Sequence, residues 1–415
     1  MADMSISGVS ISGGFTLTLP PTVPSAPTIG TATATGATTA TVTFTAPVNN
    51  GGATITSYTA TSSPAGGTGT LSQAGSGTIN VTGLSGSTTY TFTVTATNSV
   101  GTSSPSAASN SITTPSVIPP KKAIFGYGYG FSTDYTAITN LVSNTGVVAT
   151  DTAGVGTARG FLAAAGYGSD KAIFGYGQDL SGIALSMTNK VSNTGTVAND
   201  TTGVGTARHG LAAAGYGTDK AIFGYGYINS GPPDFINTIY SLTNLVSNTG
   251  VVATDTAGVG TARRLLAAAG YGTDKAIFGY GLTSAAVSMT NLVNNTGVVA
   301  NDTTGVGTAR YVLAGASYGT DKAIFGFGAP ASGFTAITNL VSNTGVVATD
   351  TSGVGTAREM GGASEYGTGK AIFGYGYASS SYLSMTNLVS DTGVVATDTT
   401  GVGTARGYLA AASYG

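Results

Sequence analysis

Charged side chains, cysteine and tryptophan are scarce or absent in this chain of 415 residues. Only 8% of the residues are charged and the formal net charge is −2, whereas roughly 25% of residues are charged in ordinary soluble proteins. A nearly neutral chain has no basic field that would favour nucleic acid. The absence of cysteine excludes disulfides, so the sequence carries no mark of its redox compartment.

Long hydrophobic runs are missing as well. No uninterrupted apolar stretch approaches the length of a membrane span, so we expect no membrane insertion. Residues 1–12 have neither a basic stretch nor a continuous apolar core, so they lack the pattern of a secretory signal. Helical periodicity is absent, and short alternating runs rich in Thr, Val and Tyr between Gly-rich turns predict an all-β protein.

Residues 1–24 are predicted to be an N-terminal β-arm that anchors the protein to a partner. Residues 15–19 alternate with the period of a strand, and prolines at 20, 21 and 24 end the pattern. A lone strand is not stable by itself, so this segment either adds to a partner's sheet edge or stays disordered. The apolar side chains of the anchor are Ile6, Val9, Ile11, Phe15, Leu17 and Leu19.

Residues 25–116 show the spacing of a β-sandwich. Short alternating strands are predicted at residues 39–45, 54–61, 78–81, 90–97 and 109–113, and Gly- and Asn-rich turns separate them. The proline-rich residues 117–121 are predicted to form a stiff, extended linker.

This segment resembles a fibronectin type III domain. The resemblance is carried by Pro24-Ser-Ala-Pro27, Phe44-Thr-Ala-Pro47, Ile55-Thr-Ser-Tyr58 and the stretch from Leu84 to Ser106. It implies a spacer or adhesion module in which the Tyr90 hydroxyl ties its strand to the preceding loop. Phe44 stands where the family usually has tryptophan.

From residue 122 onward the chain repeats one pattern six times. Each repeat opens with Lys-Ala-Ile-Phe-Gly, continues with Thr-Asn and Asn-Thr-Gly or Asp-Thr-Gly turns, and then has Gly-Val-Gly-Thr-Ala-Arg before a strand of small residues. The opening lysines lie about 47–55 residues apart, which is the range of propeller blades. Each repeat is therefore predicted to supply four strands, or one blade.

The order of strands resembles the Kelch motif, although Gly-Tyr-Gly replaces the paired glycines and tryptophan is absent. The region begins with a second strand and ends with an inner strand at residues 409–415. Closing the ring places this C-terminal strand beside residues 122–127 and removes an open sheet edge. The prediction is a six-bladed β-propeller over residues 122–415.

Two places differ between repeats: the connection after the second strand and the two residues after each repeated arginine. In a propeller both lie on one rim, which we call face A, while the constant turns and Lys121 lie on the opposite rim, face B. Face A thus faces away from the linker and is the candidate ligand surface. Its candidate residues are Phe131, Tyr135, Phe161, Gln178, Asp179, His209, Asp234, Phe235, Tyr240, Arg264, Tyr311, Phe334, Glu359, Tyr382 and Tyr408.

Each repeated arginine follows an aspartate by eight residues. Six structural pairs that fix the connections between blades are favoured over a charged ring that captures an anion. The predicted pairs are Asp151–Arg159, Asp200–Arg208, Asp255–Arg263, Asp302–Arg310, Asp350–Arg358 and Asp398–Arg406.

Catalytic and metal-binding patterns are lacking, so we expect neither a cofactor nor a metal. His209 is the only histidine, which excludes a metal site built on several imidazoles. Glu359 and Glu365 are the only glutamates, and a glycosidase pair formed by them is conceivable but unsupported.

An uncharged arm, a fibronectin-like module and a near-identical propeller array are similar in organisation to bacteriophage virion proteins. The analogy implies a non-enzymatic fibre, spike or decoration subunit that binds other virion proteins through its arm and a host glycan or protein through its propeller. A homo-oligomer is possible, and the expected location is the virion after assembly in the host cytoplasm. The alternatives are a bacterial cell-surface adhesin and a propeller glycan hydrolase.

Overall fold

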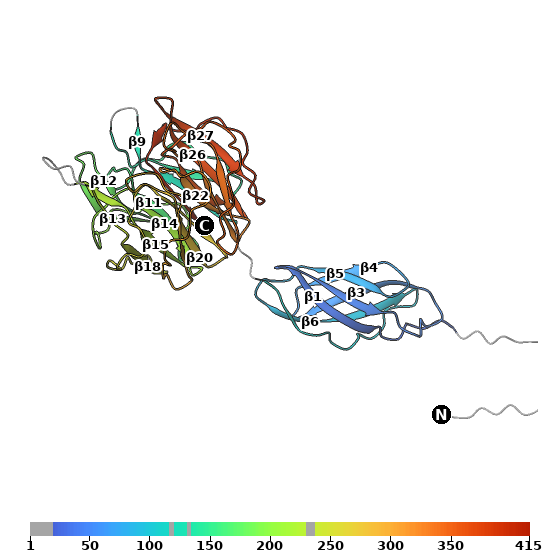
Figure 1. The fold of residues 1–415 in the computed structure, drawn as a ribbon. Helices are drawn as coiled ribbons and strands as arrows, with labels where there is room; N and C mark the ends of the chain where they lie inside the picture. The colour runs from blue at the N-terminus through green and yellow to red at the C-terminus, as the bar shows by residue number, and fades with distance from the viewer. Residues whose placement is uncertain (1–19, 116–119, 131–133, 230–236) are drawn as a thin grey trace, which may run out of the picture. The chain divides into compact units, whose positions relative to one another are not determined.

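The structure is a computed structural model that describes residues 20–115, 120–130, 134–229 and 237–415. Its contacts divide the chain into two compact units, Met1–Ile118 and Pro119–Gly415. All regular elements of the described residues are β-strands, labelled β1 to β29 (Figure 1). The predicted all-β class is therefore confirmed, whereas the six anchor residues between Ile6 and Leu19 lie outside the described residues.

The first unit is an antiparallel sandwich whose seven strands follow the order β1-β2-β5-β4-β3-β6-β7. Alternate side chains of its strands, such as Val42, Tyr58 and Phe92, are fully or almost fully buried in one core. The strands are β1 (Thr28–Gly36), β2 (Thr39–Thr45), β3 (Ile55–Ser63), β4 (Thr68–Leu71), β5 (Gly77–Thr82), β6 (Thr89–Asn98) and β7 (Ile112–Thr113).

Four of the five predicted sandwich strands agree with β2, β3, β5 and β6 to within two residues. The fifth is shorter than predicted, because residues 103–110 accompany β6 in an irregular way. There Ser103, Ser106 and Ser109 each pair with β6 twice, since the backbone N–H donates to a β6 carbonyl and the hydroxyl accepts from a β6 N–H. Strands β1 and β4 were not predicted, because they are rich in Gly and Thr and each has only one large apolar residue, Ile29 and Leu71.

The two aromatic residues singled out in the sandwich occupy structural positions. The backbone N–H of Ser85 donates to the Tyr90 hydroxyl at 2.9 Å, which ties β6 to the preceding loop as predicted. Phe44 is buried, and its ring centre lies 4.2 Å from that of Tyr58.

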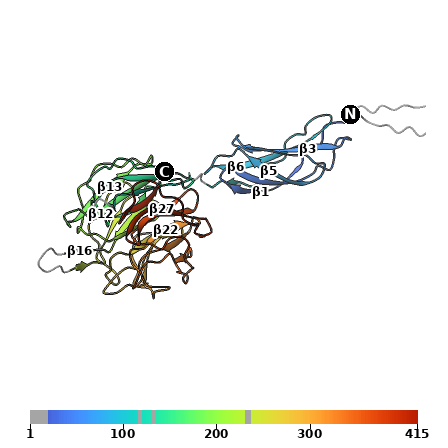
Figure 2. The ribbon, with the colours of Figure 1, turned by 90° about the horizontal axis from the view of Figure 1, so that it is seen from above.

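The second unit consists of small antiparallel sheets that follow one another around a ring (Figures 1 and 2). Each blade has an inner, a second and a third strand. In blade order these are β29 (Ala410–Tyr414), β8 (Lys122–Gly126), β10 (Thr139–Val142); β11 (Ala163–Tyr167), β12 (Lys171–Gln178), β13 (Ala184–Val191); β14 (Ala212–Tyr216), β15 (Lys220–Gly224), β18 (Thr243–Val246); β19 (Ala267–Tyr271), β20 (Lys275–Gly279), β21 (Thr290–Val293); β22 (Ala314–Tyr318), β23 (Lys322–Gly326), β24 (Thr338–Val341); and β25 (Gly362–Tyr366), β26 (Lys370–Ala378), β27 (Ser381–Val389).

Four shorter strands extend these blades: β9 (Tyr129–Gly130), β16 (Tyr227–Asn229), β17 (Asn237–Ile239) and β28 (Arg406–Gly407). The C-terminal strand β29 pairs with β8, with Ala410 opposite Gly126 and Tyr414 opposite Lys122. The six inner strands contact one another in the closed order β29-β11-β14-β19-β22-β25. The predicted six-bladed ring, closed by the C-terminal strand, is therefore confirmed.

The predicted fourth strand of each blade is not a regular strand. In the first blade the outer segment is joined to β10 by two isolated bridges, Val142 with Val148 and Thr139 with Thr152. Between the bridges the outer segment has one residue more than β10, which interrupts the pairing. The Asn140 side chain bonds there to the Ala149 carbonyl and to Asp151, at 3.0 and 2.9 Å.

The Lys-Ala-Ile-Phe-Gly strands are buried on both faces because neighbouring blades cover them. Phe174 is fully buried, and its ring lies over Gly126 of the preceding blade. A Cβ atom added at Gly126 would lie 2.7 Å from Cζ of Phe174. This glycine provides the space for the aromatic ring of the next blade.

We therefore expect Gly126→Ala to lower the free energy of unfolding by about 1–3 kcal/mol, because the ring and strand must move apart. Gly130→Ala is the matched control, since a Cβ there has no neighbour closer than 3.6 Å. Urea unfolding of both variants measures the difference. Equal stability of the two variants would contradict this account of the blade packing.

Candidate functional site

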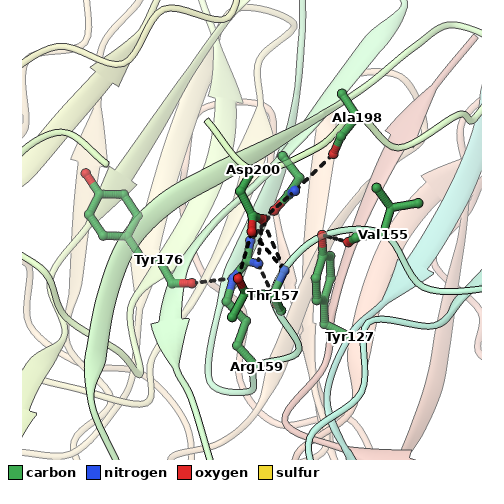
Figure 3. A network of polar contacts seen from close by, with 8 residues as sticks. Tyr127, Val155, Thr157, Arg159, Tyr176, Ala198 and Asp200 are labelled. Carbon is green, nitrogen blue, oxygen red and sulfur yellow. Dashed lines mark hydrogen bonds and ion pairs between the residues drawn. The ribbon is translucent and has the colours of Figure 1, made fainter. Parts of the chain in front are cut away.

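Neighbouring blades are joined by a buried arginine cluster, which we call the arginine junction. In the first one, Nε of Arg159 donates to the Tyr176 carbonyl at 2.8 Å, and its two terminal nitrogens donate to Thr157 O and Asn189 Oδ1 at 3.0 and 2.6 Å (Figure 3). The guanidinium carbon also lies 4.4 Å from the centre of the Tyr127 ring. One side chain thus contacts two blades through hydrogen bonds and a cation–π contact.

An aspartate of the following blade completes each junction. Asp200 accepts hydrogen bonds from the Thr157 N–H and hydroxyl at 2.9 and 2.7 Å and from Asn189 at 2.9 Å, and it lies 3.8 Å from Arg159 (Figure 3). Burial lowers the pKa of Arg159. Burial alone would raise the pKa of Asp200, but the hydrogen bonds from Thr157 and Asn189 bring it below its ordinary value.

The predicted pairing of each arginine with the aspartate eight residues earlier is therefore wrong. The chain leaves one blade directly after each aspartate and enters the next blade. The arginine that follows therefore lies beside the aspartate of the next blade. The six Asp–Arg sets are Arg159 with Asp200, Arg208 with Asp255, Arg263 with Asp302, Arg310 with Asp350, Arg358 with Asp398 and Arg406 with Asp151. The last set joins the two ends of the ring.

Face A begins directly after these arginines. The second residue after each arginine donates its backbone N–H to the carbonyl of its counterpart in the preceding blade, at 2.7–3.1 Å. The six bonds form a closed ring around the axis, through Phe161, Gly210, Leu265, Val312, Met360 and Tyr408. All six residues have positive φ, between 50° and 62°, which is unusual for bulky side chains. The ring uses only backbone atoms, so it does not depend on the chemistry of the side chains at these positions.

The side chains of this ring surround an axial cavity of about 80 Å³. Its floor is a layer of leucines at the start of the inner strands, among them Leu162 and Leu409, with Gly361 taking the leucine position in the sixth blade. Phe161, Met360 and Tyr408 line its wall. The mouth of the propeller on face A is thus a small cavity lined by apolar residues and glycines.

Two rows of aromatic rings lie on face A, and Phe161 and Tyr408 of one row line this cavity. The outer row consists of Phe334, Tyr377, Tyr382, Tyr129 and Tyr135, with successive ring centres 6.0, 5.1, 5.8 and 5.3 Å apart. The inner row consists of Tyr408, Phe161, His209 and Tyr227, with ring centres 3.7, 5.7 and 4.0 Å apart, and Arg264 lies over Tyr227.

Glycines at the rim allow these rings to lie close to the backbone. A Cβ at Gly160 would lie 2.4 Å from the Tyr135 ring, and a Cβ at Gly407 would lie 3.1 Å from that of Tyr382. In both cases the tyrosine belongs to the preceding blade. A tyrosine ring of the preceding blade can therefore pack against the backbone only where the first residue after the arginine is glycine.

Three polar side chains on face A have polar atoms without a hydrogen-bond partner among the described residues: His209, Arg264 at Nε, and Glu359. His209 is fully buried, and neither of its ring nitrogens has a hydrogen-bond partner among the described residues. Burial, and then the charge of Arg264, lower the pKa of His209 to about 4. Glu359 is 8% exposed, and burial raises its pKa to about 7.

The structure brings together many of the predicted face A residues. Those that belong to the two rows or adjoin them are Tyr135, Phe161, His209, Arg264, Phe334, Glu359, Tyr382 and Tyr408.

The other predicted residues of face A lie elsewhere or have structural contacts. Gln178 pairs with Gly160 through the backbone, and Asp179 caps a turn by accepting from the Ser181 and Ile183 N–H groups. Tyr240 lies close enough to Arg208 to affect its pKa, and Tyr311 pairs with Ala329. Phe131, Asp234 and Phe235 lie outside the described residues.

Three tyrosines of the two rows, Tyr129, Tyr227 and Tyr377, were not among the candidate residues, although they begin the connections that differ between repeats. Each follows a Gly-Tyr-Gly sequence directly, and this sequence was interpreted as the end of a strand. The signal that could have found them is the residue after Gly-Tyr-Gly, which differs between blades: Tyr, Gln, Tyr, Leu and Tyr, with Ala after the Gly-Phe-Gly of the fifth blade.

Face B, unlike face A, is formed by residues that recur in the blades. Its cavity of about 150 Å³ is lined by repeated turn residues such as Ser169 and Thr218 and by Lys121, as predicted for this rim. Lys121 forms an ion pair with Glu365 at 2.7 Å, and lysines such as Lys171 pair with the aspartate that precedes them. Among the described residues no group of three or more His, Cys, Asp or Glu side chains could hold a metal.

Residues 25–112 match the family model of the fibronectin type III domain, so the sandwich is a domain of this type. No curated protein matches the chain. Among solved structures, one titled "Structure of YjhT" is similar, with a TM-score of 0.41 and 10% sequence identity over 55% of this chain and 82% of that chain. None of the described residues forms a helix long and apolar enough to cross a membrane.

The buried histidine should make the propeller sensitive to acid. The folded pKa of His209 lies below its unfolded value of 6.5, so its stability contribution is complete above pH 6.5 and is lost as the pH falls toward 4. The loss corresponds to about 3 kcal/mol. His209→Phe keeps an aromatic ring beside Tyr227 but cannot take up a proton.

The stability of both proteins, measured by urea unfolding from pH 8 to pH 4, tests this prediction. The wild-type protein should lose more stability than His209→Phe over this interval. If the two curves run parallel, His209 does not titrate in the folded protein as its burial requires.

Proposed function

We propose that this chain is a non-enzymatic structural and display subunit of a bacteriophage particle, that is, a fibre, spike or decoration protein. Residues 1–24 anchor it to other virion proteins, the fibronectin type III domain is a spacer, and the Kelch-like propeller recognises the host surface through face A. The protein acts in the virion, after assembly in the host cytoplasm.

The observation that carries this proposal is the separation of constant and variable residues in the propeller. Residues that differ between blades gather on face A as rows of aromatic rings, while face B repeats the same turn residues around its mouth. Aromatic side chains provide large contact areas with polar edges, which suits binding of sugars or proteins. Solubility from Thr, Ser and Asn rather than from charge suits a subunit packed in an assembly.

A bacterial cell-surface adhesin with the same modules is the alternative, because the same face would then bind a partner cell. A glycan hydrolase is disfavoured by the position of the two glutamates. Glu359 adjoins the face A ring and Glu365 lines the face B cavity. Glu359 precedes β25, whereas Glu365 lies within β25 and lines the cavity of the opposite rim, so the two carboxylates do not face one shared site as a glycosidase pair does.

Deletion of residues 1–19 tests the proposal, because the sandwich keeps the Thr22 hydrogen bonds to Gly51 and Asn98 and the propeller closes without the deleted residues. The shortened chain should remain folded, should fail to enter assembled phage particles and should still bind host cells. Incorporation of the shortened chain into particles would contradict the anchoring role. Failure of the full-length protein to bind host cells would contradict the display role.

A further inference from the structure

Glu359 is unusual among the residues that follow the repeated arginines. The other five blades have Gly, His, Arg, Tyr and Gly at this position. Glu359 is held in place by two backbone bonds to Tyr377, at 3.0 and 2.8 Å, and the residue is 8% exposed. Within the described part of the chain no hydrogen bond or ion pair involves its carboxylate.

The surroundings of Glu359 are aromatic. Tyr382 and Tyr408 lie close enough for the charge of Glu359 to raise the pKa of both phenols, in addition to the effect of their burial. The Tyr382 ring contacts those of Tyr129 and Tyr377, and Tyr408 also lines the axial cavity. A single carboxylate therefore lies close to one tyrosine of each aromatic row, and Tyr408 also borders the axial cavity.

A carboxylate that is largely removed from water and has no hydrogen-bond donor is held at a cost in free energy. Buried polar groups of this kind concentrate at functional sites. The cost is removed when a ligand places a hydrogen-bond donor next to the carboxylate. The adjoining tyrosine rings require that the same ligand also present an apolar surface.

We propose that Glu359, with Tyr382 and Tyr408, forms the primary binding site for a pyranose ring of a host-surface glycan. The C–H face of the sugar packs on the tyrosine rings, and a hydroxyl group pairs with the Glu359 carboxyl. This proposal rests on the display function proposed above and specifies its ligand class and its site.

A sugar fits this site better than a cationic ligand. A hydroxyl group both donates and accepts hydrogen bonds, so it can pair with the carboxyl in either protonation state. An ammonium group requires the ionised carboxylate, which burial disfavours at Glu359. A sugar ring also has the amphipathic shape that rows of tyrosines bind.

The test uses the full-length protein and a panel of sugars: the methyl glycosides of glucose, galactose and mannose, N-acetylglucosamine, and glucosamine as the cationic member. Titration is followed by tyrosine fluorescence, which is free of tryptophan background in this chain. We expect at least one neutral sugar to bind at millimolar concentration. Glu359→Gln should weaken this binding about tenfold or more, and Tyr382→Ala should abolish it.

Two controls separate binding from folding. Glu365→Gln changes the only other glutamate, at the face B cavity, and should leave sugar binding unchanged. Glu359→Gln should be at least as stable as the wild-type protein at pH 8, because burial of the charged carboxylate opposes folding there. The folded pKa of about 7 lies above the unfolded value of 4.5, so this side chain contributes less stability as the pH rises through 7.

The proposal is overturned if no neutral sugar binds, if only glucosamine binds, or if Glu359→Gln binds as well as the wild-type protein. Host-cell binding separates this failure from failure of the display function. If host binding survives both Glu359→Gln and periodate oxidation of the cell surface, face A recognises a protein and the glycan site is wrong. If the wild-type protein binds no host cells, the display function itself is wrong.

Discussion

The propeller depends on a positive charge that is buried in every junction between blades. Each guanidinium is almost inaccessible to solvent, and its nitrogens are engaged by backbone and asparagine oxygens, with an aromatic ring over one face. Such a buried charge is tolerated only if its N–H groups have hydrogen-bond acceptors. These acceptors come from the two blades that meet at the junction. Each blade takes part in two junctions, so the same acceptor residues must recur in every repeat. The near-identity of Thr-Ala-Arg, Thr-Asn and Gly-Tyr-Gly through the chain follows from this requirement.

The same geometry explains where the repeats are free to differ. Beyond each arginine, the face A ring is made by backbone N–H and carbonyl groups alone, so it places no demand on side-chain chemistry. The connections after the second strands carry no junction residues either. Variation therefore gathers at one rim, where Tyr382 and Tyr135 lie over Gly407 and Gly160 of the next blade. The arginine junctions therefore explain both why their residues recur in every blade and why the residues of face A can differ between blades.

The architecture could be predicted from the sequence because it depends on period and order: six repeats that start with a second strand and end with an inner strand close into six blades. The partner of each arginine could not be predicted, because Asp151 and Arg159 are close in sequence while Asp200 is close only in the folded ring. Strands β1 and β4 lack the apolar alternation that identifies a strand. The rim of face A was predicted, but the role of Tyr129 and Tyr377 depends on ring contacts between adjacent blades.

The free energy of unfolding of an Arg310→Met propeller tests the central claim most directly. Methionine fills much of the space but leaves Asn339 Oδ1 and the carbonyls of Phe327 and Thr308 without their donor. If the buried guanidinium holds the blades together, the variant should lose about 3–5 kcal/mol, the cost of breaking a buried charged network. An unchanged or increased stability would show that packing alone closes the ring and that the arginine junction does not determine the fold.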